Sequence, residues 1–263
     1  MALYRTTYPV VGPASRPVTK RPVYRGGNSG VVSPVFTPTD LTNIRIWLDA
    51  SDTGTIAETL GAVSQWDDKS GNSNHAVQST AGNQPTTGAA TQNGLNVLTV
   101  DGNDKMDITT LSVTGSQNRS LLCIMDSAGG PFFSHGNSSA GGKWVFTTDA
   151  GDVRLEVGFG AYVTNLAVGG QHQVVGCILD GTQLQDNVLV VDGVTETAIG
   201  ANNINTSANT FYIFAKEIGS SPFANPGGEF AEFVFGTAAW SASEQNNYGN
   251  YANGKWATSW SDI

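Results

Sequence analysis

The chain has 263 residues with only 13% charged side chains, and its formal net charge is −9. An acidic chain of this kind excludes nucleic acid as a partner of its body, because phosphate binding needs clustered Lys and Arg. No apolar run approaches the roughly 20 residues that a membrane span requires, so we expect no membrane insertion.

Residues 1–39 differ from the rest of the chain. They hold six of the ten prolines and five basic residues but no acidic one, which leaves eight basic and 22 acidic residues in 40–263. Dense proline prevents helix and central strand, so we expect an extended arm that cannot form a core of its own. The N-terminus also lacks the apolar stretch of a secretory signal, which predicts synthesis in the cytoplasm without signal-peptide export.

The body, residues 40–263, contains short apolar runs at regular spacing. Many short strands separated by turn residues predict an all-β sandwich or jelly roll. The runs lie at 44–49, 96–100, 120–125, 143–148, 153–157, 172–179, 187–191, 211–215 and 229–235. Asp-Gly pairs at 101–102, 180–181 and 192–193 predict hairpin turns, because such turns need positive φ.

One short segment, VSQWDDKSGNSNHAVQ at 63–78, concentrates polar side chains behind Trp66. It is compatible with an ordered turn, with a calcium loop, or with a catalytic site. An ordered turn is the favoured interpretation, since Asp, Ser and Asn side chains bond to nearby backbone and Gly71 accepts positive φ. The calcium alternative would use Asp67, Asp68, Asn72 and Asn74, although their spacing is not that of a known calcium loop.

The remaining candidates are weaker. The segment GGPFFSHGNSSAGGKW suggests a glycan-binding loop, with candidate residues Phe132, Phe133, His135, Asn137 and Trp144. Cys123 and Cys177 lie in apolar runs and are expected to be buried thiols rather than a disulfide framework. No histidine has a neighbour at metal-ligand spacing.

The C-terminal segment WSASEQNNYGNYANGKW predicts a short helix. Ser241 and Glu244 form a capping-box pattern, and Tyr248, Ala252 and Trp256 follow at helical spacing. We expect this helix to rest on the sandwich through its aromatic face.

Several of these segments together resemble the concanavalin A-like lectin/glucanase superfamily, in its laminin G-like branch, of the kind found in bacteriophage virion proteins. The resemblance lies in residues 44–56, 64–78, 83–108, 169–181, 187–194 and 228–257. It implies a concanavalin A-like jelly-roll β-sandwich over 40–263, with a short C-terminal helix and an extended N-terminal arm. The fold alone does not imply an activity.

The glucanase branch of the superfamily uses paired carboxylates on one strand. Glu229 and Glu232 are the nearest candidates, but an offset of three along a regular strand places them on opposite faces. No E-x-D-x-E run occurs. We therefore expect no enzyme and assign no catalytic residue, and we require no cofactor.

The combined expectation is a non-enzymatic virion structural protein on the virion surface, of the capsid-decoration or fibre type. Its arm would bind other virion proteins such as capsid, portal or tail, and the protein would form a homo-oligomer such as a trimer. The arm residues expected at that interface are Tyr4, Arg5, Tyr8, Arg16, Lys20, Arg21, Tyr24 and Arg25. The alternatives are a carbohydrate-binding adhesin that recognises a host glycan and a glycoside hydrolase of the same fold.

Overall fold

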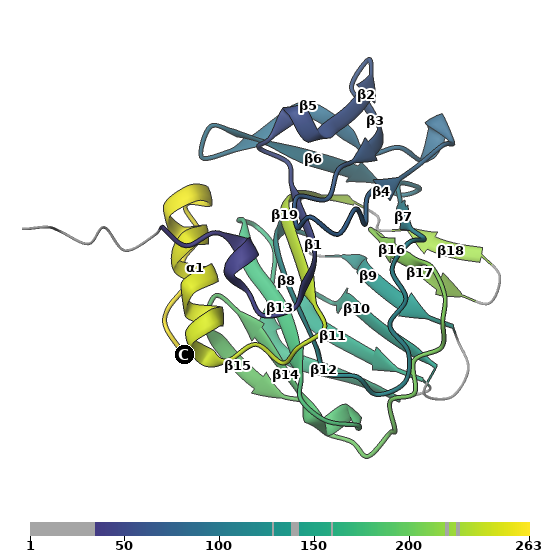
Figure 1. Cartoon of the computed structure of the whole chain (residues 1–263), viewed down its shortest axis with the longest axis vertical. Helices are drawn as coiled ribbons and strands as arrows, with labels where there is room; N and C mark the ends of the chain where they lie inside the picture. The colour runs from purple at the N-terminus through teal and green to yellow at the C-terminus, as the bar shows by residue number, and fades with distance from the viewer. Residues whose placement is uncertain (1–34, 128, 138–141, 159, 219–220, 225–226) are drawn as a thin grey trace, which may run out of the picture. The chain divides into compact units, whose positions relative to one another are not determined.

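Antiparallel strands make up most of the regular structure, and an α-helix lies near the C-terminus (Figure 1). The computed structural model describes residues 35–263 except 128, 138–141, 159, 219–220 and 225–226. Within that part of the chain, hydrogen bonds connect 17 strands into one continuous antiparallel sheet that folds into two layers, and β17 and β18 form a separate hairpin. The prediction of an all-β chain with a short C-terminal helix is confirmed.

The first layer is built around β19, which pairs with β1, β6 and β8. From β8 the layer continues through β13 and β14 to β15, and β5 extends it beside β6. Its strands are β1 (Ile44–Asp49), β5 (Thr86–Gln92), β6 (Leu95–Asp101), β8 (Arg119–Asp126), β13 (Gln173–Leu179), β14 (Asn187–Val191), β15 (Val194–Thr197) and β19 (Gly227–Gly236).

The second layer runs in the spatial order β2-β3-β4-β7-β16-β9-β10-β11-β12. Its strands are β2 (Ile56–Thr59), β3 (Ala62–Trp66), β4 (Ala76–Val77), β7 (Met106–Ile108), β9 (Gly130–Gly136), β10 (Lys143–Asp149), β11 (Asp152–Val157), β12 (Gly160–Ala167) and β16 (Phe211–Ile213). The hairpin of β17 (Ala215–Ile218) and β18 (Ser221–Ala224) follows β16, and short 3-10 helices lie at Pro38–Asp40, Thr53–Thr55, Ala81–Asn83 and Leu184–Asp186.

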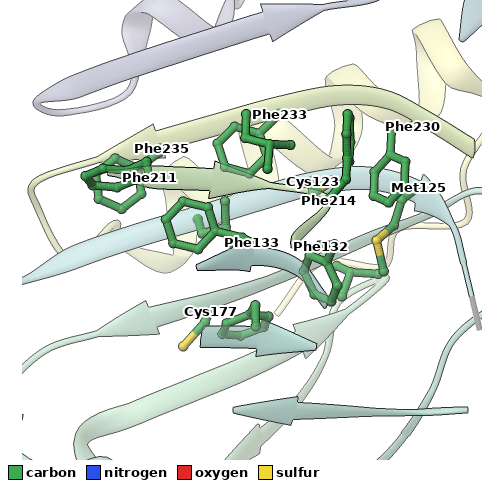
Figure 2. Packing of buried hydrophobic residues seen from close by; sticks show 14 of the residues in the cluster. Cys123, Met125, Phe132, Phe133, Cys177, Phe211, Phe214, Phe230, Phe233 and Phe235 are labelled. Atoms are coloured by element: carbon green, nitrogen blue, oxygen red, sulfur yellow. The ribbon is translucent and has the colours of Figure 1, made fainter. Parts of the chain in front are cut away.

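The inner faces of the two layers enclose an aromatic core (Figure 2). Phe233 and Phe235 of β19 lie against Phe133 of β9, with ring centroids 5.5 and 5.8 Å apart. Cys123 and Cys177 are free thiols and lie in the same core. Alternation along each strand sends these side chains inward and leaves the intervening residues on the outer faces.

Helix α1 (Ala242–Trp256) covers the outer face of the first layer. Its capping box is present as predicted, since the Ser241 hydroxyl accepts from the Glu244 backbone N–H and the Glu244 side chain accepts in return. Tyr248, Ala252 and Trp256 are fully buried against the sheet. The helix is therefore held by tertiary packing of one face as well as by its cap.

The three Asp-Gly pairs do not behave alike. Asp192 and Gly193 both have positive φ and join β14 to β15 in a two-residue hairpin, as predicted. The pair at 180–181 begins a longer loop through Leu184–Asp186 before β14, and the pair at 101–102 ends β6 without a hairpin partner directly after it. The dipeptide marked a strand end in all three places, but it formed a tight hairpin in only one.

Candidate functional site

The polar segment behind Trp66 is an ordered turn. The Asp68 carboxylate accepts hydrogen bonds from the backbone N–H groups of Trp47, Ser70 and Asn74, at 2.9 Å each. Trp66 is fully buried, and Gly71 has a φ of 86°. The ordered turn agrees with the favoured interpretation. Its side chains also fasten it to β1, which the sequence did not predict.

The other residues of the calcium alternative also make protein contacts. Asp67 accepts from Gln65 Nε2 at 2.6 Å, and the amide groups of Asn72 and Asn74 donate to carbonyl oxygens of β1. The described residues contain no group of three or more His, Cys, Asp and Glu side chains that would hold a metal ion. The geometry of this segment is that of a hydrogen-bonded turn.

The structure places most of the predicted glycan-loop residues in the interior. Phe132, Phe133, His135 and Trp144 are at most 1% exposed, and Asn137 is half-buried. The segment forms β9 and β10 rather than a loop, so these four side chains face the core and present no surface to a ligand. The arm residues Tyr4, Arg5, Tyr8, Arg16, Lys20, Arg21, Tyr24 and Arg25 lie outside the described residues.

Glu229 and Glu232 lie on the same face of β19, contrary to the expectation from regular alternation. A β-bulge at Ala231 shifts the register against β8, so that Glu229 faces Asp126 and Glu232 faces Ile124. The two glutamates still do not form a pair. Glu229 lies 3.7 Å from His172 Nε2, whereas Glu232 contacts α1.

Glu232 belongs to a buried charged network between β1, β19 and α1. Asp49 faces it in the β1–β19 ladder, and Lys255 Nζ lies 2.8 Å from Asp49 Oδ1 and 2.9 Å from Glu232 Oε2. Glu232 also accepts from Trp47, Tyr251 and Trp256. Because Asp49 is 3% exposed and Glu232 is 0% exposed, no substrate reaches this carboxylate pair.

The pKa values of Asp49 and Glu232 shift in opposite directions. Burial would raise the pKa of Asp49, but the charge of Lys255 and hydrogen bonds from Lys255, Lys69 and Ser51 outweigh it and lower that pKa. Burial dominates at Glu232 and raises its pKa in spite of Lys255. The network thus anchors the helix to the sheet.

The outer face of the second layer carries a row of residues that faces away from the aromatic core. Strand pairing aligns them one per strand from β2 to β12. We call them the outer row: Ala57, Gln65, Val77, Asp107, Tyr212, Ser134, Val145, Glu156 and Ala161.

A cavity of about 380 Å³ opens at the β2–β7 end of the outer row. Its walls combine carboxylate, amide and hydroxyl groups with small apolar surfaces, and they are formed by Ala57, Ser64, Gln65, Val77, Gln78, Ser79 and Asp107. Tyr212 lies beside it, directly opposite Asp107, and Lys105 Nζ lies 5.3 Å from the Tyr212 ring centroid. Concave sites with a few convergent polar groups are the usual places for small ligands.

The other end of the outer row holds a cationic cluster, defined as Lys143, Arg154 and Lys216 around Glu156. The Glu156 carboxylate accepts from Lys143 Nζ at 2.7 Å and from Lys216 Nζ at 2.9 Å. Burial would raise the pKa of Glu156, but the hydrogen bonds and charges of the two lysines outweigh it and lower that pKa. The carboxylate is therefore ionised at neutral pH.

Asp107 and Glu156 do not form a glycosidase pair. Four strand steps of about 4.8 Å separate their strands, which amounts to about 19 Å. Glycosidases place the two carboxyl groups within about 10 Å of each other. In the middle of the outer row, Ser134 and Val145 are 2% exposed, and the Ser134 hydroxyl donates to the carbonyl oxygen of Ala215 in β17. The strand β17 therefore covers this part of the row, and the two ends of the row are separate sites.

Reasoning from the sequence did not find this face. Alternation in KMDI, FYIF and VRLEV marks Asp107, Tyr212, Arg154 and Glu156 as pointing away from the core, and this was the available signal. Among the described residues, no helix is both long and apolar enough to span a membrane.

No family model matches the sequence, and no curated protein is similar enough to count as a relative. Solved structures do share the fold. An arabinofuranosidase in complex with arabinofuranosyl-α-1,2-xylobiose is 14% identical with a TM-score of 0.56, over 72% of this chain and 50% of that one. Trypanosoma rangeli sialidase in complex with sialic acid is 13% identical with a TM-score of 0.54, over 82% of this chain and 33% of that one.

A third similar structure is a single domain. Domain 4 of AbnA, an extracellular GH43 arabinanase from Geobacillus stearothermophilus in complex with arabinotriose, is 13% identical with a TM-score of 0.51, over 77% of this chain and 96% of that domain. By contrast, the chain spans half of the arabinofuranosidase and a third of the sialidase. At these identities the likeness establishes a shared fold.

These comparisons correct two expectations. The chain was expected to be a virion structural protein, but the structures that share its fold include arabinofuranosidases, sialidases and a domain of an arabinanase. It was also expected not to be an enzyme, and this is contradicted by the same finding, because arabinofuranosidases and sialidases are enzymes. The fold of the chain is thus one found in carbohydrate-active proteins.

Proposed function

We propose that the domain binds a glycan on its outer row, as part of a carbohydrate-active protein. The observation that carries the proposal is the cavity of about 380 Å³ with Asp107 on its wall and Tyr212 beside it on the same face. Carboxylate and amide oxygens accept hydrogen bonds from hydroxyl groups, and an aromatic ring offers a flat apolar surface with a polar tip. A sugar presents both kinds of surface.

The match to domain 4 of the arabinanase supports this proposal, since that domain is covered almost completely and its structure contains arabinotriose. Glycan binding was also the adhesin alternative expected from the sequence. The residues now proposed differ, because they lie on the outer row rather than among Phe132, Phe133, His135 and Trp144. A concanavalin A-like jelly-roll topology is proposed with it, supported by the two packed antiparallel layers.

Binding is tested by calorimetric titration of the full chain with arabinan, xylan and sialylated oligosaccharides. We expect Tyr212→Ala to weaken binding at least tenfold, while Tyr212→Phe retains most of it because the ring remains. Tyr162→Ala is the control. Tyr162 lies on β12 of the same layer, but its side chain packs against the core and not on the outer row. Equal affinity of the Tyr212→Ala variant and the unmodified chain would reject this site.

Release of reducing ends from the same polysaccharides is measured in parallel. Hydrolysis would assign the domain the type of activity of the arabinofuranosidases and sialidases that share its fold. If the polysaccharide is hydrolysed, the binding titration is repeated with the oligosaccharide product. Binding to the outer row is then measured whether or not the domain hydrolyses the polysaccharide.

The arm and domain division predicted from the sequence remain proposals. Phe36 packs against Tyr251, with ring centroids 6.0 Å apart, so a shortened chain that tests the arm should keep residues 35–263. Comparing the sedimentation of this shortened chain with that of the full chain measures whether the arm joins copies of the protein. The same molar mass for both would reject a role of the arm in oligomerisation.

A further inference from the structure

The cationic cluster on the outer row has a layered arrangement. Glu156 is 5% exposed and lies beneath three basic side chains, whereas Lys143, Lys216 and Arg154 are 20%, 19% and 32% exposed. Each lysine donates one N–H to Glu156 and has two more donors on its ammonium group. The buried carboxylate therefore holds two cations close together at the surface, where they would otherwise repel each other.

Charge on the outer face differs from charge on the rest of the domain. Four of the eight basic residues in 40–263 lie on this face, namely Lys105, Lys143, Arg154 and Lys216. The acids that pair with them or lie beside them on β7, β10 and β11 are Asp107, Asp149, Asp152 and Glu156, and Glu217 follows Lys216 on β17, so positive and negative charges nearly balance there. The remainder has four basic and 17 acidic residues.

A negative ligand is repelled by most of this domain and less so here, where the positive and negative charges nearly balance. Lys105 lies over the Tyr212 ring, whereas Lys143, Arg154 and Lys216 gather around Glu156. A carboxylate placed between two ammonium groups forms charge-assisted hydrogen bonds, which are stronger than those of a neutral hydroxyl. An acidic glycan thus forms stronger hydrogen bonds with these ammonium groups than a neutral glycan does.

We propose that the glycan bound on the outer face is acidic, with a sugar carboxylate held by Lys143 and Lys216. This inference rests on the proposed function of glycan binding. It adds the chemical class of the ligand and assigns the cationic cluster as a second site on the same face.

The test uses a matched pair of ligands: oligogalacturonate, and the same oligosaccharide with its carboxyl groups reduced to the neutral sugar. We expect the full chain to bind the acidic form at least tenfold more tightly at low salt. The difference shrinks as salt rises, because exposed charges are screened. This comparison needs no variant, so it does not depend on the folding of one.

A triple variant, Lys143→Gln with Glu156→Gln and Lys216→Gln, tests the residues. Glu156 is included so that no unpaired carboxylate stays buried. We expect its affinity for the acidic form to fall to that of the neutral form. Lys69→Gln is the matched control, since Lys69 also pairs with a buried carboxylate and is 22% exposed, but lies outside the outer row.

The outcomes separate the two proposals. Equal binding of both forms, unchanged in the triple variant, would overturn the acidic-ligand inference and leave glycan binding intact. Binding of neither form, together with no binding of arabinan or xylan, would overturn both. If the triple variant still binds the acidic form more tightly than the neutral form, the assignment to Lys143 and Lys216 is wrong.

Discussion

Lys255 of α1 and Glu232 of β19 form a buried ion pair, with Nζ 2.9 Å from Oε2. The same ammonium group also contacts Asp49, so one cation of the helix neutralises two carboxylates of neighbouring strands. This contact adds to the packing of Tyr248, Ala252 and Trp256 in holding the helix on the sheet.

Replacing Lys255 by Met should lower the free energy of unfolding by about 3–5 kcal/mol, the usual cost of leaving a buried charge without its partner. Lys69→Met is the comparison, because Asp49 then keeps Lys255 and the other partner of Lys69, Asp52, is 44% exposed. We expect a smaller loss there. Urea unfolding of both variants measures the difference, and equal losses would contradict the special role of Lys255.

Asp68→Ala should destabilise the domain by at least about 2 kcal/mol, because three backbone N–H groups lose their acceptor. The adjacent Asp67 is the natural control, since its side chain is 42% exposed and exposed substitutions usually change stability by less than about 0.5 kcal/mol. Thermal unfolding of Asp68→Ala and Asp67→Ala provides the measurement. Similar melting temperatures for the two variants would show that the turn does not depend on Asp68.

The nine strands with long apolar runs, the capping box and the polar turn were predictable because each depends on residues close together in the sequence. Short or polar strands such as β2 to β5 and β12 were missed, because they carry no such run. The bulge at Ala231 was not, since it is an extra residue fitted between β19 and β8, and it reverses the face on which Glu232 lies. The outer row could not be predicted from the sequence either, because its residues are aligned only by the pairing register of nine strands. Phe133 was misread as a loop residue because Gly-rich sequence surrounds its buried strand. Trp144 was assigned to the same glycan-binding loop although it lies in the predicted strand 143–148.

Cys123 and Cys177 should not react with a thiol reagent in the native protein. Both side chains are buried, and burial raises the pKa of each thiol. The thiolate is the reactive form, so its concentration is very small and its access is blocked. Titration with a chromogenic disulfide should count no thiols in buffer and two in guanidinium chloride. Rapid labelling of either cysteine in buffer would show that the core opens locally.

Asp104 should make the stability depend on pH in the weakly acidic range. Burial raises the pKa of Asp104 from 3.8 to about 6. Between these values the unfolded chain has lost this proton while the folded chain keeps it, so the contribution of Asp104 falls as pH rises from about 4 to about 6 and is constant above. Urea unfolding of the unmodified chain and of Asp104→Asn at pH 4, 5, 6 and 7 isolates this contribution. A difference between the two proteins that is constant across the series would contradict the raised pKa.

Two glycines of α1 should respond in opposite directions to the same change. A Cβ on Gly249 would lie 2.1 Å from ring atoms of Trp260, which packs back onto the helix. Gly249→Ala should therefore cost about 1–3 kcal/mol through overpacking. A Cβ on Gly254 meets no atom within 4 Å. Gly254→Ala should stabilise the protein by about 0.5–1 kcal/mol, since alanine loses less backbone entropy in a helix.

Melting temperatures of the two single variants test this contrast within one helix. Because the substitution and the secondary structure are the same, helix propensity alone predicts stabilisation at both positions. A lower melting temperature for Gly249→Ala and a higher one for Gly254→Ala would show that contact with Trp260 outweighs propensity at position 249. Stabilisation by both would mean that Trp260 is free to move away from the helix, and that the C-terminal residues contribute little to holding α1 on the sheet.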